Sequence, residues 1–286
     1  MHTEFGLTEF LFFLLCTKNP KSTRAYLDSL SPQKRLVVQQ KEWFNFWNRL
    51  QCMIPDFKEK VIVDYGCGYG FDSLFALQKG AKHLYALEVS TSRLEQSMQL
   101  HETHGFSNVT YINNENVSDL TTKIGNKNVD IVLCRDVMEH VSSPAKVLKS
   151  IHDILKTGGL AYIGLSPFFR SPYGAHIRSK CALPWVHLIF SEKTVIKVFK
   201  KLYNLSKNTK KYIDIEGSGV NKLSYFEYLN IIHKFDWIIE NNYINSFPDR
   251  GFPANLLNIM IKISPFQIIK ELFIVNSYVT IRKDTI

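Results

Sequence analysis

A carboxylate and three closely spaced glycines stand together between positions 61 and 70. Residues 61–63 are β-branched and apolar, as a central strand buried on both faces requires. Gly66, Gly68 and Gly70 allow positive φ angles and a close approach of a ligand to the backbone. The helix that must follow would point its first amides at that ligand, and Asp64 is placed to bind a cation or a hydroxyl there. The pattern predicts a cradle for a ligand of nucleotide size.

The spacing of the glycines distinguishes this loop from other glycine-rich turns. A dinucleotide fingerprint places its third glycine three residues after the second, and a Walker loop ends in Lys-Ser or Lys-Thr. The chain has neither arrangement. Residues 83–88 are a second predicted strand, which ends in Glu88, 18 residues after Gly70. At about this separation, a βαβ unit brings an acid to the hydroxyls of a bound ribose.

Two later segments complete a family pattern: VDIVLCRDVMEHV at 129–141 and LKTGG at 155–159. With the glycine loop and Glu88, they resemble the class I S-adenosylmethionine-dependent methyltransferases over roughly residues 60–166. The resemblance implies S-adenosylmethionine as the cofactor, with its methionine part at the loop, its ribose at Glu88 and its adenine beside Asn116 and Val117. The family usually has Asp in place of Asn116. The cofactor-binding residues implied in this way are Asp64, Gly66, Cys67, Gly68, Gly70, Glu88, Val89, Asn116, Val117, Cys134 and Arg135.

Strands and helices alternate along the chain, which predicts a parallel sheet with helices on both faces. Ser90 and Ser143 offer capping hydroxyls at two helix starts, and Gly158-Gly159 offers a helix stop and turn. The last strand would lie antiparallel beside the fifth, as the resemblance implies. We therefore expect an α/β fold: a Rossmann-like doubly wound seven-stranded sheet, mostly parallel with one antiparallel strand. The predicted strands lie near 61–65, 83–88, 109–113, 129–134, 160–165, 236–244 and 274–282. The predicted helices lie near 71–79, 91–104, 144–156, 191–203, 224–233 and 265–271.

The segments on either side of the core predict the organisation of the chain. Residues 1–55 are expected to form an N-terminal helical cap, and 56–286 the methyltransferase domain. Within it, about 166–235 would be an insert after the fifth strand. This insert begins with a segment rich in proline, glycine and aromatic residues, and it leaves the sheet at the edge where ligands bind. The insert and the cap are therefore expected to form the acceptor pocket, with the insert as a lid.

Histidines are the candidates for acid–base chemistry. Methyl transfer depends mainly on alignment, but a hydroxyl acceptor also needs a base. The candidates are His140, His176 and His187, for which pocket shaping, hydrogen bonding or packing are alternatives. No carboxylate lies near His176 and His187 in the sequence, so no metal is expected. Aromatic walls of an acceptor pocket are expected from Phe44, Trp47, Phe168, Tyr173 and Trp185. The alternative for residues 43–47 is a buried helix face.

Composition limits the class of protein. The 286 residues are 45% apolar and 21% charged, as in a globular domain. Five dispersed cysteines indicate neither a disulfide framework nor a zinc site and favour the cytoplasm. The apolar run 10–16 is too short to span a membrane and lacks the basic start of a signal peptide. We expect it to pack on the body or on a second subunit of a homodimer, with a peripheral membrane contact as the alternative and no stable insertion.

The net charge of +9 belongs almost entirely to the second part of the chain. Residues 1–165 hold 18 basic and 17 acidic side chains, and residues 166–286 hold 17 and 9, a net +8. Seven lysines lie between 193 and 211, where a solvated helix face or an anionic partner would explain them. No basic stripe alternates with aromatics, and no Asn-Pro-Pro-Tyr or Asp-Pro-Pro-Tyr follows the fourth strand, so no nucleic-acid partner is expected.

The function expected from these patterns is S-adenosylmethionine-dependent methylation of a small molecule, with oxygen as the favoured acceptor atom. Methylation of nitrogen or sulfur is the first alternative. The alternative outside the enzymes is a catalytically inactive protein that binds the cofactor and serves as a partner subunit.

Overall fold

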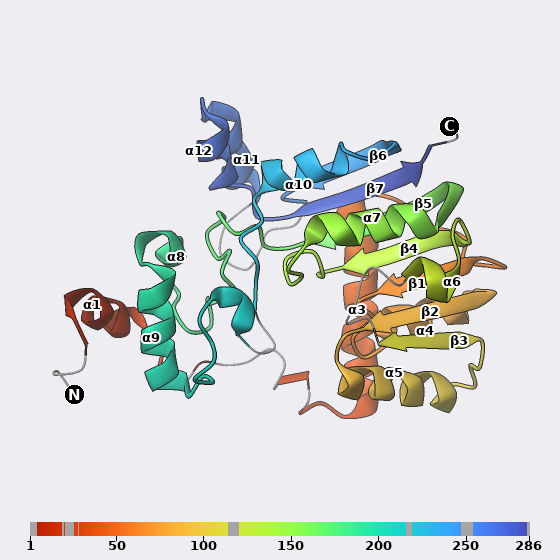
Figure 1. The fold of residues 1–286 in the computed structure, drawn as a ribbon, viewed down its shortest axis with the longest axis horizontal. Coiled ribbons are helices and arrows are strands. Elements are labelled where there is room, and N and C mark those ends of the chain that lie inside the picture. Colours follow the sequence, from red (N-terminus) through yellow and green to blue (C-terminus); the bar gives the residue numbers. More distant parts are fainter. Residues whose placement is uncertain are drawn as a thin grey trace.

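A mixed seven-stranded sheet is the centre of the computed structural model, which describes residues 5–18, 20, 26–27, 29–113, 120–215, 219–246 and 254–284. The strand order is β3-β2-β1-β4-β5-β7-β6 (Figure 1). The first five strands are parallel, and β7 runs antiparallel to both β5 and β6. The predicted fold class is therefore confirmed. The strands are β1 (Val61–Tyr65), β2 (His83–Glu88), β3 (Val109–Asn113), β4 (Val129–Arg135), β5 (Leu155–Leu165), β6 (Trp237–Ile244) and β7 (Ser277–Lys283).

The helices follow the predicted order with a few additions. They are α1 (Leu7–Leu15), α3 (Pro32–Leu50), α4 (Phe71–Gln78), α5 (Thr91–Thr103), α6 (Leu120–Ile124), α7 (Pro144–Ile154), α8 (Val186–Ile189), α9 (Glu192–Tyr203), α10 (Tyr225–Ile232), α11 (Ala254–Ile263) and α12 (Gln267–Glu271), with a 3-10 turn η2 (Tyr212–Asp214). The sequence analysis did not predict α6, α8 or α11. None of the described helices is both long and apolar enough to cross a membrane.

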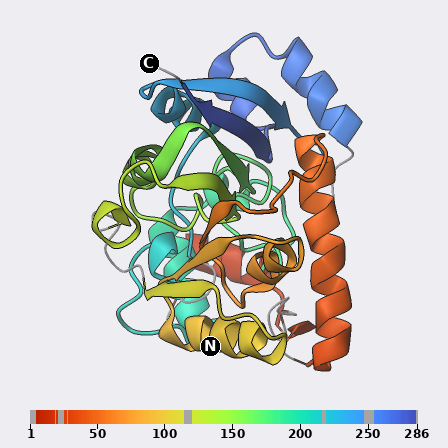
Figure 2. The same cartoon turned by 90° about the vertical axis from the view of Figure 1, so that its right-hand side faces the viewer.

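Two apolar layers cover the two faces of the sheet. Successive strand residues point to opposite faces, so Ile62 packs under α3 and α4 while Val63 packs under α6, α7 and α10. Figure 2 shows α3 along one face and α7 on the other. The layer under α3 includes Trp43 and Trp47, which are 1% and 2% exposed. Trp43 and Trp47 therefore form a buried helix face, which was the alternative prediction for residues 43–47.

A third apolar cluster holds the insert together, and it lies beside the sheet (Figure 1). Phe12 of α1 is fully buried there, with its ring centroid 5.2 Å from that of Phe190 and 5.6 Å from that of Phe199. The apolar N-terminal run thus packs on α9 of the same chain. Leu7 and Leu14 on the other side of α1 are 76% and 62% exposed.

Two local predictions were wrong. Gly158-Gly159 does not stop a helix: α7 ends at Ile154, and the glycines lie within β5, where the pairing register with β4 shifts. Gly158 has φ +77°, so the pair serves a bulge in the strand. The predicted starts of α5 and α7 are right, but the hydroxyls of Ser90 and Ser143 make no capping bond. The amide of Ser90 donates instead to the carboxylate of Glu88, at 3.0 Å.

Candidate active site

The glycine loop between β1 and α4 needs its glycines for two different reasons. All three have positive φ: +78° at Gly66, +55° at Gly68 and +81° at Gly70. A Cβ at Gly70 would lie 2.2 Å from the Oγ of Ser97 and 2.8 Å from Nε2 of His101, so close packing excludes a side chain there. A Cβ at Gly68 would meet no atom within 4 Å. Gly68 therefore leaves space free for a ligand.

The carboxylate of Glu88 fixes the loop to the end of β2. Its Oε2 accepts from the amide of Gly68 at 3.1 Å, and its Oε1 accepts from Ser90. Arg93 lies 3.4 Å from Oε2. A carboxylate offers about four acceptor sites, and Gly68, Ser90 and Arg93 use three of them, so Glu88 keeps capacity for one hydrogen bond from a ligand hydroxyl beside the loop.

A cavity of about 200 Å³ lies over the loop. Gln39 on α3 borders it, as do residues from the ends of β1 and β4. The other residues that line the cavity are Asp64, Gly66, Cys67, Gly68, Tyr69, Phe71, Asp72, Arg135 and Asp136. Within it, Arg135 Nε contacts Asp72 Oδ2 at 3.0 Å.

Acidic side chains outnumber basic ones among the residues that line this cavity. Three carboxylates, of Asp64, Asp72 and Asp136, face a single arginine among its lining residues. Burial and the neighbouring Asp72 raise the pKa of Asp64 to about 7, although Ser73 Oγ donates to it at 2.6 Å. Burial also raises the pKa of Asp72, and the guanidinium of Arg135 opposes that rise. A ligand with ammonium and sulfonium groups would compensate these charges.

Beyond Asp136, at the end of β4, two of the predicted histidines meet. The rings of His140 and His176 lie 5.1 Å apart, edge to face. Nδ1 of His140 donates to the carbonyl of Gly219 at 2.5 Å. Glu139 lies beside them, with Oε1 4.0 Å from Nε2 of His140. The sequence analysis found no carboxylate near His176, because Glu139 precedes it by 37 residues and only the fold brings them together.

These two histidines differ in environment. Burial and the charge of His140 lower the pKa of His176 to about 4. Burial raises the pKa of Glu139 well above its usual range, and the charge of Asp136 adds to the rise. Asp136 also interacts with the charge of His140. Since Asp136 lines the cavity over the glycine loop, the cluster and the cavity are neighbours.

Two comparisons with known proteins bear on the fold and the family of this chain. A family model described as "Methyltransferase domain" matches residues 56–187. An S-adenosylmethionine-dependent methyltransferase from Mesorhizobium loti shares the fold, with a TM-score of 0.52 over 83% of this chain and 97% of that chain at 15% identity. Residues 56–187 are a class I S-adenosylmethionine-dependent methyltransferase domain.

The chain also has curated relatives by sequence. It is 38% identical to protein arginine N-methyltransferase 1 of Chlamydomonas reinhardtii over 77 residues, which are 27% of this chain and 21% of that protein. It is 27% identical to ribosomal protein L11 methyltransferase of Legionella pneumophila (strain Paris) over 146 residues, 48% of this chain and 47% of that protein. The chain thus spans between a fifth and a half of the length of these relatives.

The other predicted cofactor-binding residues differ in whether they lie at the cavity. Arg135 lines the cavity. Cys134 is fully buried in the apolar layer under α7, and Val89 is 60% exposed after β2. Asn116 and Val117 lie outside the described residues.

His187 does not join the histidine cluster. It is 5% exposed in α8, and its Nε2 donates to the carbonyl of Phe169 at 2.6 Å. Burial lowers its pKa to about 4. No hydrogen bond or ring contact described for His187 reaches His140 or His176.

The predicted aromatic walls are also dispersed. Trp47 and Phe168 are core residues, 2% and 1% exposed. Phe44 is 49% exposed on the outer side of α3. Tyr173 lies under the guanidinium of Arg178, at 4.5 Å, and the indole of Trp185 donates to the carbonyl of Leu272 at 3.1 Å. Side-chain type alone could not separate core aromatics from pocket aromatics.

Asn221, at the end of the insert, was missed by sequence reasoning. Its side-chain amide donates to the carbonyls of Met138 at 2.7 Å and Val141 at 2.8 Å. Its backbone amide donates to the carbonyl of Glu139 at 2.8 Å. Asn221 therefore holds the loop that carries Glu139 and His140. No sequence signal connects Asn221 to a loop 80 residues away. Asp136 and Glu139, which were also not predicted as site residues, lie within the family segment at 129–141 and could have been found there.

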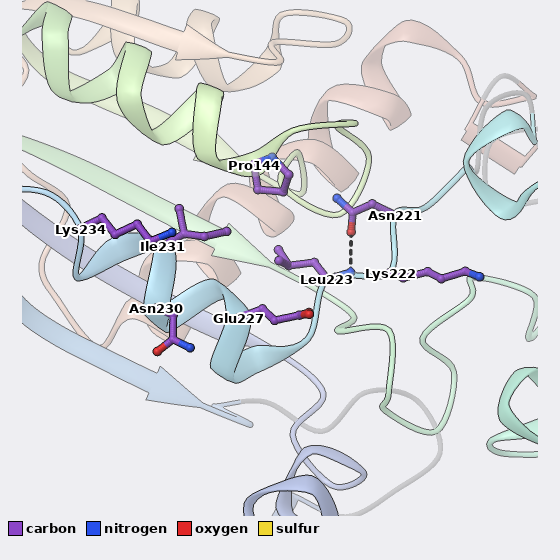
Figure 3. A pocket seen from close by; sticks show the side chains of 8 residues that line it. All are labelled: Pro144, Asn221, Lys222, Leu223, Glu227, Asn230, Ile231 and Lys234. Carbon is purple, nitrogen blue, oxygen red and sulfur yellow. Dashed lines mark hydrogen bonds between the residues drawn. The ribbon is translucent and has the colours of Figure 1, made fainter.

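A larger hollow, of about 450 Å³, lies elsewhere, between the start of α7 and α10 (Figure 3). Pro144, Leu223 and Ile231 line it together with polar side chains, and Figure 3 shows the bond from the amide of Leu223 to Asn221. It shares no lining residue with the cavity over the glycine loop. We therefore do not assign it to the reaction.

Proposed function

We propose that this protein transfers a methyl group from S-adenosylmethionine to an oxygen atom of a small molecule. The observation that carries the proposal is the meeting of His140 and His176 beside Asp136, at the edge of the cofactor cavity. A hydroxyl acceptor needs a group that receives its proton. Imidazole rings such as those of His140 and His176 can do so.

The residues of the cavity fit the cofactor. The space left by Gly68 admits a ligand against the backbone, and Glu88 can accept a hydrogen bond from a ribose hydroxyl. The carboxylates of Asp64 and Asp72 would hold its positive groups. When bound, S-adenosylmethionine supplies an electrophilic methyl group, so the chain's task is to align the acceptor and to exclude water.

The insert would provide the acceptor site. His176 comes from its first segment, and Asn221 fixes its last segment to the loop after β4. The division into a cap at 1–55, a domain at 56–286 and an acceptor lid at about 166–235 belongs to this proposal. A homodimer and a cytoplasmic location stay predictions.

A macromolecular acceptor is the main alternative. The curated relatives are named for action on protein arginine and on ribosomal protein L11. Their matches cover 27% and 48% of this chain. Methylation of nitrogen or sulfur in a small molecule, and a catalytically inactive partner subunit, are further alternatives.

One incubation tests the proposal. The purified protein is mixed with S-adenosylmethionine and a metabolite extract, and products are sought whose mass is raised by one methylene. We expect one small product that carries the methyl group on oxygen. Methyl incorporation into protein or RNA alone would contradict the small-molecule proposal. A protein that binds the cofactor and methylates nothing in any extract would favour the inactive subunit.

A further inference from the structure

We propose that Glu139, His140 and His176 bind a divalent transition-metal cation at the border of the cofactor cavity. One ligand atom from each residue lies within 4.8 Å of the other two. The residues come from two distant segments, the end of β4 and the insert. The inference goes beyond the proposed methyl transfer and does not depend on it: a bound cation would take the lone pairs of His140 and His176, so these imidazoles receive the acceptor's proton only in the metal-free protein.

Glu139 is the residue that most needs a cation. It is only 2% exposed, and neither of its carboxylate oxygens has a full hydrogen bond among the described residues, although the backbone amides of Glu139 and Ser166 oppose the rise in its pKa. A buried carboxylate is costly unless it is paired, hydrogen-bonded or bound to a metal. Among the described ion pairs, no lysine or arginine is paired with Glu139. His140 is the basic residue paired with it, with Nε2 4.0 Å from Oε1 of Glu139.

His140 is already oriented as a metal ligand. Its Nδ1 must carry the proton, since it donates to the carbonyl of Gly219. The lone pair therefore lies on Nε2, the atom 4.0 Å from Glu139 Oε1. A backbone carbonyl that holds the second ring nitrogen is the usual support of a metal-bound histidine. Gly219 must itself be glycine, since a Cβ there would lie 2.2 Å from the carbonyl oxygen of Ile213.

The geometry requires only a small contraction. Three atoms that lie no more than 4.8 Å apart surround a point at most about 2.8 Å from each. Inward shifts of less than about 1 Å would bring them to the 2.0–2.2 Å of zinc ligands. Two imidazoles and one carboxylate favour zinc and its first-row neighbours over magnesium or calcium. Three protein ligands leave coordination positions open for a water or an acceptor oxygen.

Metal binding can be measured without any methyl acceptor. The chelator-treated full-length protein is titrated with Zn²⁺ by calorimetry and with Co²⁺ by visible absorption. We expect one equivalent to bind, with Co²⁺ bands typical of nitrogen and oxygen ligands. Glu139→Gln and His176→Ala should each weaken binding by at least about 100-fold. His104→Ala is the matched control: His104 is an exposed histidine just after α5, and the variant should bind as the wild type does.

Three results would overturn the metal site. These are no binding of Zn²⁺ or Co²⁺ by the wild type, unchanged binding in the Glu139→Gln, His176→Ala double variant, or Co²⁺ charge-transfer bands from cysteine thiolates. Thermal melts and S-adenosylhomocysteine binding, expected to be retained, would show that the variants fold. If the proposed methyl transfer fails, these titrations are unaffected, so the two failures are distinguishable.

Discussion

Gly68 is the residue at which the cofactor site can be tested most directly. A side chain at this position would point into open space over the loop, so it would displace a ligand rather than a protein atom. We expect Gly68→Val to weaken S-adenosylhomocysteine binding on the order of 10- to 100-fold, since overpacking a fitted site costs about 1–3 kcal/mol. Titration calorimetry measures this loss.

Gly105→Val is the control for backbone strain. Gly105 also has a positive φ, +80°, and a Cβ there would meet nothing within 4 Å, but it lies in the turn after α5. Its variant should lose similar stability and keep its affinity. Equal affinities in Gly68→Val and the wild type would contradict the site.

We expect Asp64 to make cofactor binding depend on pH. Its pKa of about 7 means that the carboxyl is mostly protonated at pH 6 and mostly ionised at pH 8. A cationic ligand prefers the ionised form, so affinity should rise with pH and be about tenfold higher at pH 8 than at pH 6. Calorimetry at both values tests this. Asp64→Asn should bind the ligand more weakly, and its affinity should not change with pH. If the affinity of Asp64→Asn still rose with pH, another titrating group would be responsible.

Asn221 connects two elements, the insert and the loop after β4. Asn221→Ala would leave the carbonyls of Met138 and Val141 without their donor, at a cost of about 1–3 kcal/mol in the free energy of unfolding. Because Glu139 and His140 would lose their support, methyl transfer should fall more than S-adenosylhomocysteine affinity does. Asn230→Ala, at an exposed position on α10, should change neither quantity. Equal loss of turnover in both variants would contradict a positioning role.

The N-terminal helix α1 is an element of the insert's core. Phe12→Ala should cost about 3–5 kcal/mol of unfolding free energy, because a fully buried ring would leave a cavity against α9. Leu14→Ala, at a position 62% exposed, should stay within about 0.5 kcal/mol of the wild type. Urea unfolding measures both, and hydrogen exchange in α9 locates the loss. Equal effects of the two changes would mean that α1 does not pack as described.

Charge belongs to the scale of the whole molecule. Several basic side chains of the second half have local partners: Lys197 pairs with Glu9, Lys222 with Glu192, and Lys200 donates to the carbonyl of Lys207. We therefore expect duplex and single-stranded oligonucleotides to bind weakly and to be released as salt is raised. Fluorescence anisotropy at several salt concentrations measures this. Tight binding at physiological salt, or methyl incorporation into RNA, would contradict the small-molecule proposal and place the acceptor site at the seven lysines between 193 and 211.

The sequence by itself determined the parts of the protein that are local. The alternation of strands and helices, the three glycines and Glu88 all lie within or next to one βαβ unit, and short-range backbone preferences fix them. Strands β1, β2 and β3 begin and end at the predicted residues. The same local signals failed at Gly158-Gly159, where pairing with β4 overrides the preference of glycine for a helix end.

Only the tertiary structure decided which distant residues meet. His176 reaches His140 and Glu139, Asn221 reaches Met138, and α1 reaches α9 across long stretches of chain. It also decided which aromatics are core, as at Trp47, and which histidine stands apart, as at His187. Burial and contact are properties of the folded packing, and residue type and spacing in one sequence do not specify them.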